Sequence, residues 1–170
     1  MKEKITQKNQ NPFWTAFNAA QKINTQKPGE DQSEEFGLLE ASIAKLDKET
    51  QKRLVFLMAK KVLEGNLQIQ PLFAVARIAK MITVAYNASV IKKATEEGLT
   101  FSDLCQVGLA EIRKREDGKP SITYRLGKEA LKEASQKLRM SGKINSAKII
   151  EDHLRRGERN KALAEAAATA

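Results

Sequence analysis

Residues 71–97 read PLFAVARIAKMITVAYNASVIKKATEE, and this stretch decides the predicted fold. Apolar side chains recur at helical spacing along it, from Leu72 and Val75 through Ile82 to Tyr86, and further apolar residues fill the flanks of that stripe. A helix that is apolar over most of its circumference is normally buried. We therefore expect one long central helix over 71–97, ended by Gly98.

Shorter helical patterns surround this stretch. Asn11-Pro12 is typical of a helix start and predicts a helix over 13–23. Further patterns predict helices over 33–46, 47–64, 102–109, 128–140 and 145–157, the last ended by Gly157. The chain is thus predicted to be mainly α, with about six to seven helices around the central one.

Residues 110–126 fit two structures. They continue a helix, or they form a β-hairpin in which Asp117-Gly118 makes the turn and Ile122, Tyr124 and Leu126 alternate with polar residues. Pro120 suits a turn or strand edge better than a helix interior. We favour a small hairpin near 110–126.

Composition divides the chain into three parts. Residues 1–32 are predicted to be a flexible N-terminal arm with a short aromatic helix, because Lys27-Pro28-Gly29 resembles a linker. Residues 33–157 are expected to form a single helical domain with a basic C-terminal half. Residues 158–170 form an alanine-rich tail with little to bury beyond Leu163, so we expect this tail to fray.

Few residues suit catalysis. The 170 residues include one cysteine, Cys105, and one histidine, His153, so no internal disulfide, structural zinc site or Cys/His pair is predicted. The glycines show no phosphate-binding spacing. We expect no enzyme, cofactor or metal. The single thiol and the absence of an apolar signal core near Met1 favour the cytoplasm, and no apolar run is long enough for transmembrane insertion.

The positive charge is concentrated. The chain has a net charge of +9, and the window 113–148 alone holds eleven Lys or Arg against four acids. Such a field attracts polyanions. The predicted phosphate-contacting residues are Arg113, Arg115, Lys119, Arg125, Lys128, Lys132 and Arg139.

A basic hairpin followed by an amphipathic helix resembles the wing and trailing helix of a winged helix-turn-helix domain. The resemblance covers about residues 99–140 and is generic to the fold pattern. It implies that wing cations neutralise phosphates while the preceding helix reads bases. The sequence departs from it, since 102–109 has room for only one of the two short helices required. A solvated helix face with ordinary Glu–Lys pairs would explain the same charges.

Two function classes follow. The first is a non-enzymatic nucleic-acid-binding protein that prefers DNA to RNA, because Tyr124 is the only aromatic residue of the basic window. The second is a helical adaptor that docks onto a protein partner through Phe13, Trp14 and Phe17, or onto an acidic surface through its cations. The same aromatics would otherwise pack against the chain's own core. Attachment to anionic lipid is a third possibility.

Overall fold

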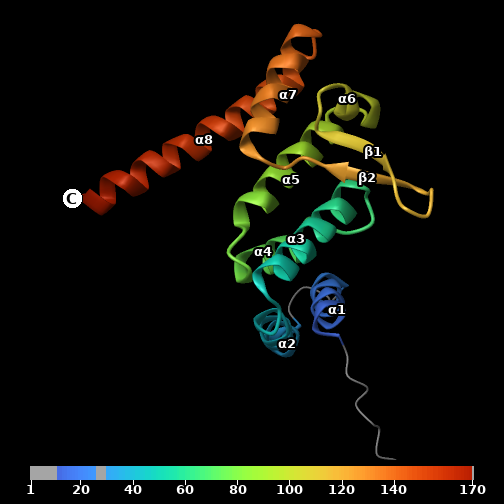
Figure 1. Cartoon of the computed structure of the whole chain (residues 1–170). Coiled ribbons are helices and arrows are strands. Elements are labelled where there is room, and N and C mark those ends of the chain that lie inside the picture. The colour runs from blue at the N-terminus through green and yellow to red at the C-terminus, as the bar shows by residue number, and fades with distance from the viewer. Residues whose placement is uncertain (1–10, 26–29, 170) are drawn as a thin grey trace, which may run out of the picture. The chain divides into compact units, whose positions relative to one another are not determined.

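The computed structural model describes residues 11–25 and 30–169. Over these residues the chain forms eight helices and one two-stranded antiparallel sheet (Figure 1). The prediction of a mainly α fold with a small hairpin is confirmed. The contacts divide the chain into two compact units, Met1–Ala85 and Tyr86–Ala170, and each unit is described by itself.

The first unit contains the helices α1 (Pro12–Thr25), α2 (Ser33–Ala44), α3 (Lys48–Leu63) and α4 (Ile69–Ile78). Helix α1 begins where Asn11 Oδ1 accepts a hydrogen bond from the Phe13 N–H at 3.0 Å. Helix α1 packs against α2, α3 and α4. The core contains the fully buried Leu39, Ile43, Leu54, Met58 and Leu72. The remainder of the predicted arm, residues 1–10 and 26–29, lies outside the described residues.

The predicted continuous helix over 71–97 is wrong, because the chain leaves the helix between α4 and α5 (Ile82–Glu96). Lys80 has a left-handed φ of 57°, the only positive φ found at a non-glycine residue in the described chain. The Met81 N–H donates to the Ala76 carbonyl at 2.7 Å, and the Lys80 N–H donates to the Arg77 carbonyl at 3.2 Å. These bonds form a Schellman helix stop, which usually contains glycine. Since Lys80 replaces that glycine, the sequence carries no visible stop signal.

The second unit contains most of α5, then α6 (Phe101–Gln106), β1 (Ala110–Lys114), β2 (Pro120–Tyr124), α7 (Lys128–Met140) and α8 (Ile144–Thr169). Helices α7 and α8 pack against each other. The core of this unit contains the fully buried Ile91, Leu109, Leu131, Leu138 and Ile150.

The hairpin settles the choice that the sequence left open at 110–126. Strands β1 and β2 are antiparallel, with Ile112 opposite Ile122 and Arg113 opposite Ser121. The turn closes through bonds of 2.9 Å from the Gly118 N–H to the Arg115 carbonyl and from the Arg115 N–H to the Lys119 carbonyl. Gly118 has a φ of 77°, a conformation that a side chain disfavours. The Asp-Gly pair therefore marks the turn correctly.

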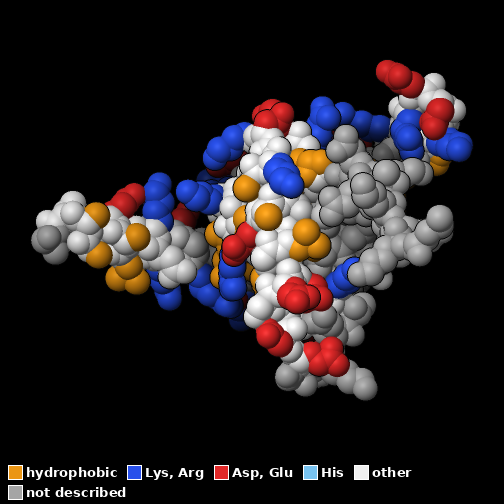
Figure 2. Space-filling view, turned by 90° about the horizontal axis from the view of Figure 1, so that it is seen from below, with side chains coloured by type: hydrophobic (Ala, Val, Ile, Leu, Met, Phe, Trp, Pro, Cys, Tyr) orange, Lys and Arg blue, Asp and Glu red, His pale blue; other side chains and the backbone are white. Residues whose placement is uncertain are grey.

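Helix α8 is longer than predicted. The expected stop at Gly157 is wrong, since α8 continues to Thr169. Every side chain from 155 to 169 is exposed. Figure 2 shows hydrophobic, acidic and basic side chains mixed along this end of α8, at the left of the view. Ala is the best helix former, so the alanine-rich end retains helical structure although its side chains are exposed.

Within the described part of the chain, no helix combines the length and apolar character needed to cross a membrane.

Candidate nucleic-acid interface

All seven cations predicted to contact phosphate are exposed, and all lie in the second unit. The hairpin and its flanks carry Arg113, Arg115, Lys119 and Arg125, and helix α7 carries Lys128, Lys132 and Arg139. The structure thus places them on two adjoining segments of the chain, and carboxylates accompany most of them.

One face of the hairpin carries two arginines around a glutamate. Side chains alternate along β1, so Glu111 and Arg113 share a face that Lys114 does not. Glu111 Oε2 lies 3.0 Å from Arg113 Nη2 and 3.6 Å from Arg125 Nη2. The arginines, Arg113 first, hold the pKa of Glu111 below its ordinary value. We call Glu111, Arg113 and Arg125 the arginine face.

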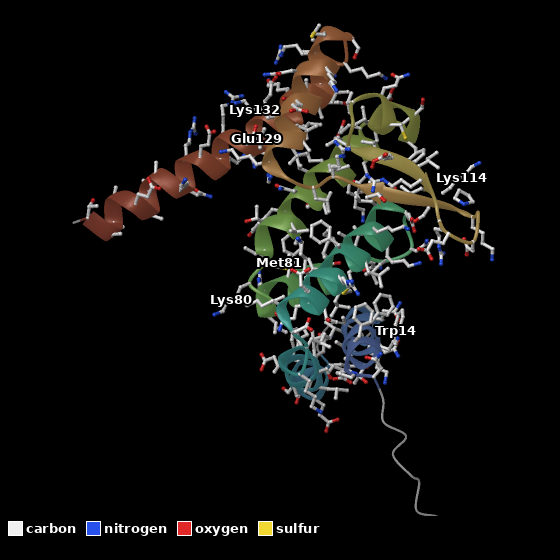
Figure 3. The ribbon with its side chains drawn as sticks, viewed as in Figure 1. Trp14, Lys80, Met81, Lys114, Glu129 and Lys132 are labelled. Carbon is white, nitrogen blue, oxygen red and sulfur yellow. The ribbon has the colours of Figure 1, made fainter. Side chains whose placement is uncertain are left out.

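The hairpin turn carries the remaining wing charges. Arg115 Nη2 lies 3.8 Å from Asp117 Oδ2, at the limit of an ion pair. Lys114 and Lys119 are exposed and have no ion pair within the described residues. Figure 3 shows Lys114 at the outer side of the hairpin. These two lysines of the hairpin can therefore bind an anion without first giving up an ion pair.

The cations of α7 face acids of α8. Lys128 Nζ lies 3.5 Å from Glu158 Oε1. Arg139 donates to Glu151 from Nε at 3.1 Å and from Nη2 at 2.6 Å. Lys132 has no ion pair in the part of the chain that the structure describes, and it lies with Glu129 on α7 (Figure 3). A groove of 360 Å³ is lined by Lys128, Lys132 and Arg155 together with Glu151 and Glu158, so the acids offset most of its positive charge.

Helix α6 does not fit the base-reading role that the winged-helix resemblance implied. It has six residues, FSDLCQ, and none is Lys or Arg. Its Asp103 is used inside the fold, because it forms a capping box with Thr100 and accepts a hydrogen bond from Lys143 Nζ at 2.9 Å. These bonds, the one from the Thr100 backbone first, lower the pKa of Asp103 to about 2. Helix α6 therefore offers no cation to a phosphate, and it is short for a helix that lies in a DNA groove.

A buried polar network in the second unit was missed by the sequence reasoning. Asn87 on α5 is only 4% exposed. Its Nδ2 donates to the Leu126 carbonyl at 2.7 Å, and its Oδ1 lies 2.8 Å from Nε2 of the half-buried His153. Burial, with Arg156 nearby, lowers the pKa of His153. The network connects α5, the segment after β2 and α8, so His153 has a structural role here.

The three aromatics proposed for partner docking lie on α1, in the first unit. Phe17 is 9% exposed and belongs to the core, whereas Trp14 is 52% exposed. Trp14 makes edge-to-face contacts with Phe13 and Phe17, with ring centroids 5.0 and 5.7 Å apart. The packing alternative is thus supported for Phe17, and Trp14 is the aromatic that remains at the surface.

Among the described residues, no group of three or more His, Cys, Asp or Glu side chains is arranged to hold a metal ion. Comparison of the chain with protein-family models, curated proteins and solved structures gives no match. The function must therefore be argued from the residues themselves.

Proposed function

We propose that this protein binds the phosphate backbone of a nucleic acid through the β1–β2 hairpin and α7, without catalysing a reaction. The arginine face is the observation that carries the proposal. Arg113 and Arg125 are 61% and 59% exposed, and they flank a single carboxylate. A guanidinium offers a planar fork of donors that matches phosphate oxygens. Two such forks on one exposed face suit adjacent phosphates.

The carboxylates beside these cations weaken the site without abolishing it. Exposed ion pairs contribute about 0–1 kcal/mol each, because water and salt screen them. A phosphate backbone offers many charges at once and releases condensed counterions when cations neutralise it. Arg113 and Arg125 can therefore exchange Glu111 for phosphate, while Lys114 and Lys119 need no exchange.

We expect duplex DNA to bind more tightly than single-stranded RNA. Recognition of single strands depends on aromatic side chains that stack on bases, and Tyr124 is the only aromatic residue from 113 to 148. Because α6 carries no Lys or Arg, the contacts should go to the backbone and give little sequence preference.

Fluorescence anisotropy with labelled duplex DNA, single-stranded RNA and an acidic peptide tests the proposal across a salt series. The logarithm of affinity for DNA should fall with the logarithm of salt, with a slope of about 0.9 per neutralised phosphate. The double change Arg113→Gln and Arg125→Gln should lower both affinity and slope. Arg53→Gln, at an exposed arginine of α3, is the matched control and should change neither.

Glu111→Gln is the sharpest variant, because it removes the carboxylate that both arginines contact. If phosphate replaces Glu111, this variant should bind DNA more tightly than the wild type. Equal affinity for the acidic peptide and for DNA would reject the nucleic-acid proposal, as would a Glu111→Gln variant with unchanged DNA affinity and unchanged stability.

A protein adaptor is the second candidate, and the exposure of Trp14 favours it. Exposed tryptophans are common anchors of protein interfaces. Trp14→Ala should abolish capture of a protein partner and leave DNA affinity unchanged. Phe17→Ala should instead lower thermal stability, because Phe17 is buried.

A further inference from the structure

The turn between α7 and α8 exposes two large apolar side chains. Met140, the last residue of α7, is 88% exposed, and Ile144, the first residue of α8, is 45% exposed. Met140 is the most exposed large hydrophobic residue of the described chain. The turn lies at the top of the view in Figure 1, at one end of the α7–α8 pair.

The stretch of chain around these two residues is rich in cations. Residues 134–150 include Lys137, Arg139, Lys143 and Lys148, and no Asp or Glu. Lys137 precedes Met140 by three positions and Lys148 follows Ile144 by four, so each lysine shares a helix face with one apolar residue. Neither lysine has an ion pair within the described residues. We call Lys137, Met140, Ile144 and Lys148 the docking tip.

The fold holds the backbone of the α7–α8 turn in one conformation. Arg139 is bound to Glu151 and Lys143 to Asp103, the latter at 2.9 Å. Gly142 has a φ of 82°, and the Lys143 N–H donates to the Leu138 carbonyl at 2.9 Å, which closes the turn. A surface that is already ordered loses little entropy on binding.

We infer that the docking tip binds the surface of a membrane that contains anionic lipid. The headgroup phosphates attract Lys137 and Lys148, while the boundary of the acyl chains accepts the side chains of Met140 and Ile144. Each lysine shares a helix face with one apolar residue, so both contacts can form together. Binding of this kind is peripheral and reversible.

A nucleic acid fits the docking tip less well. It would attract the lysines, but Met140 and Ile144 would stay in water unless one of them opened a base step. Unstacking a base step costs about as much as the burial of one such side chain returns, so the insertion would add little affinity. This inference does not depend on the arginine face, which carries the proposed nucleic-acid function on other residues.

The test is co-sedimentation of the full chain with vesicles of phosphatidylcholine, with and without phosphatidylserine. The wild type should bind the anionic vesicles and lose this binding as salt rises. The double change Met140→Ser and Ile144→Ser should lower the affinity about tenfold, the equivalent of half-burying one such side chain. The changes Lys137→Gln and Lys148→Gln should each lower it about fivefold.

Matched controls lie elsewhere on the surface. Leu163→Ser, at an exposed leucine of α8, and Lys52→Gln, at an exposed lysine of α3, should keep the wild-type affinity. Circular dichroism checks that each variant is folded, and the exposure of the changed residues leads us to expect that it is.

Equal binding to neutral and anionic vesicles would overturn the inference, and so would unchanged binding of the Met140→Ser, Ile144→Ser variant. If that variant loses affinity for DNA while the wild type ignores vesicles, the tip is a nucleic-acid contact and the lipid inference fails. The change Arg113→Gln with Arg125→Gln separates the two proposals, because it should weaken DNA binding and leave vesicle binding intact.

Discussion

Replacing Asn87 with alanine is expected to destabilise the second unit by about 2–4 kcal/mol. The buried amide of Asn87 donates to the carbonyl of Leu126, itself only 4% exposed, at 2.7 Å. A buried carbonyl left without a partner costs about 1–3 kcal/mol. The lost contact with His153 adds roughly 0.5–1.5 kcal/mol, because water can partly replace a partner of a half-buried ring.

Urea denaturation followed by circular dichroism measures this loss. The Asn87→Ala variant should unfold at a lower urea concentration, with the slope of the transition unchanged. Asn145→Ala is the matched control, because Asn145 is an exposed asparagine and its replacement should cost less than about 0.5 kcal/mol. A loss below about 0.5 kcal/mol for Asn87→Ala as well would show that the network adds nothing to stability, and our account of His153 as a structural residue would fall with it.

Three further predictions concern stability. Burial lowers the pKa of His153 from 6.5, so its contribution to the free energy of unfolding is complete above pH 6.5 and should be lost as the pH falls towards the folded pKa. NMR titration of this single histidine checks the direction of the shift. The pKa of Asp103 is lowered from 3.8 to about 2, so its contribution to the free energy of unfolding is present above pH 3.8 and lost as the pH falls between those values. The Asp103→Asn variant should lack this loss of stability when its acid unfolding is measured. Lys80→Gly should raise the thermal midpoint, because glycine relieves the strain of the left-handed φ, which costs about 1 kcal/mol. A Lys80→Val variant as stable as Lys80→Gly would contradict this.

The parts of the fold that the sequence predicts are those set by local chemistry. Asp47 begins α3 as expected, since its Oδ1 accepts a hydrogen bond from the Thr50 N–H at 2.7 Å. Asp117-Gly118 marks the hairpin turn for a similar reason, because only a few residues suit that backbone conformation. Signals of this kind depend on neighbours within three or four positions of the chain.

The features that the sequence could not predict depend on a distant contact or on an unusual residue at a local motif. Asn87 interrupts an apolar helix pattern, and its partner His153 lies 66 positions away. The stop at Lys80 uses a lysine where glycine is usual, so the continuous apolar pattern across it predicts one helix. The Asn87–His153 contact is tertiary, whereas the stop at Lys80 uses local hydrogen bonds without the residue type that usually marks them, so the spacing of residues predicts neither.

The effective charge of the basic window also could not be predicted from the sequence, and this charge bears on function. From the sequence, 113–148 is a block of excess cations, yet acids outside the block lie against it in the fold, namely Asp103, Glu111, Glu151 and Glu158. Within the described residues, the cations of the window that keep no ion pair are Lys114, Lys119, Lys132, Lys137 and Lys148.

The two proposed surfaces differ in whether their cations already form ion pairs within the protein. The docking tip uses lysines that are already free, so its attraction to an anionic surface needs no internal exchange. The arginine face must give up Glu111 before its guanidiniums bind phosphate, so its affinity should depend on that one carboxylate. Glu111→Gln should therefore strengthen DNA binding and leave vesicle binding almost unchanged. A variant that strengthened both equally would show that net charge alone governs binding, with no role for where the cations lie.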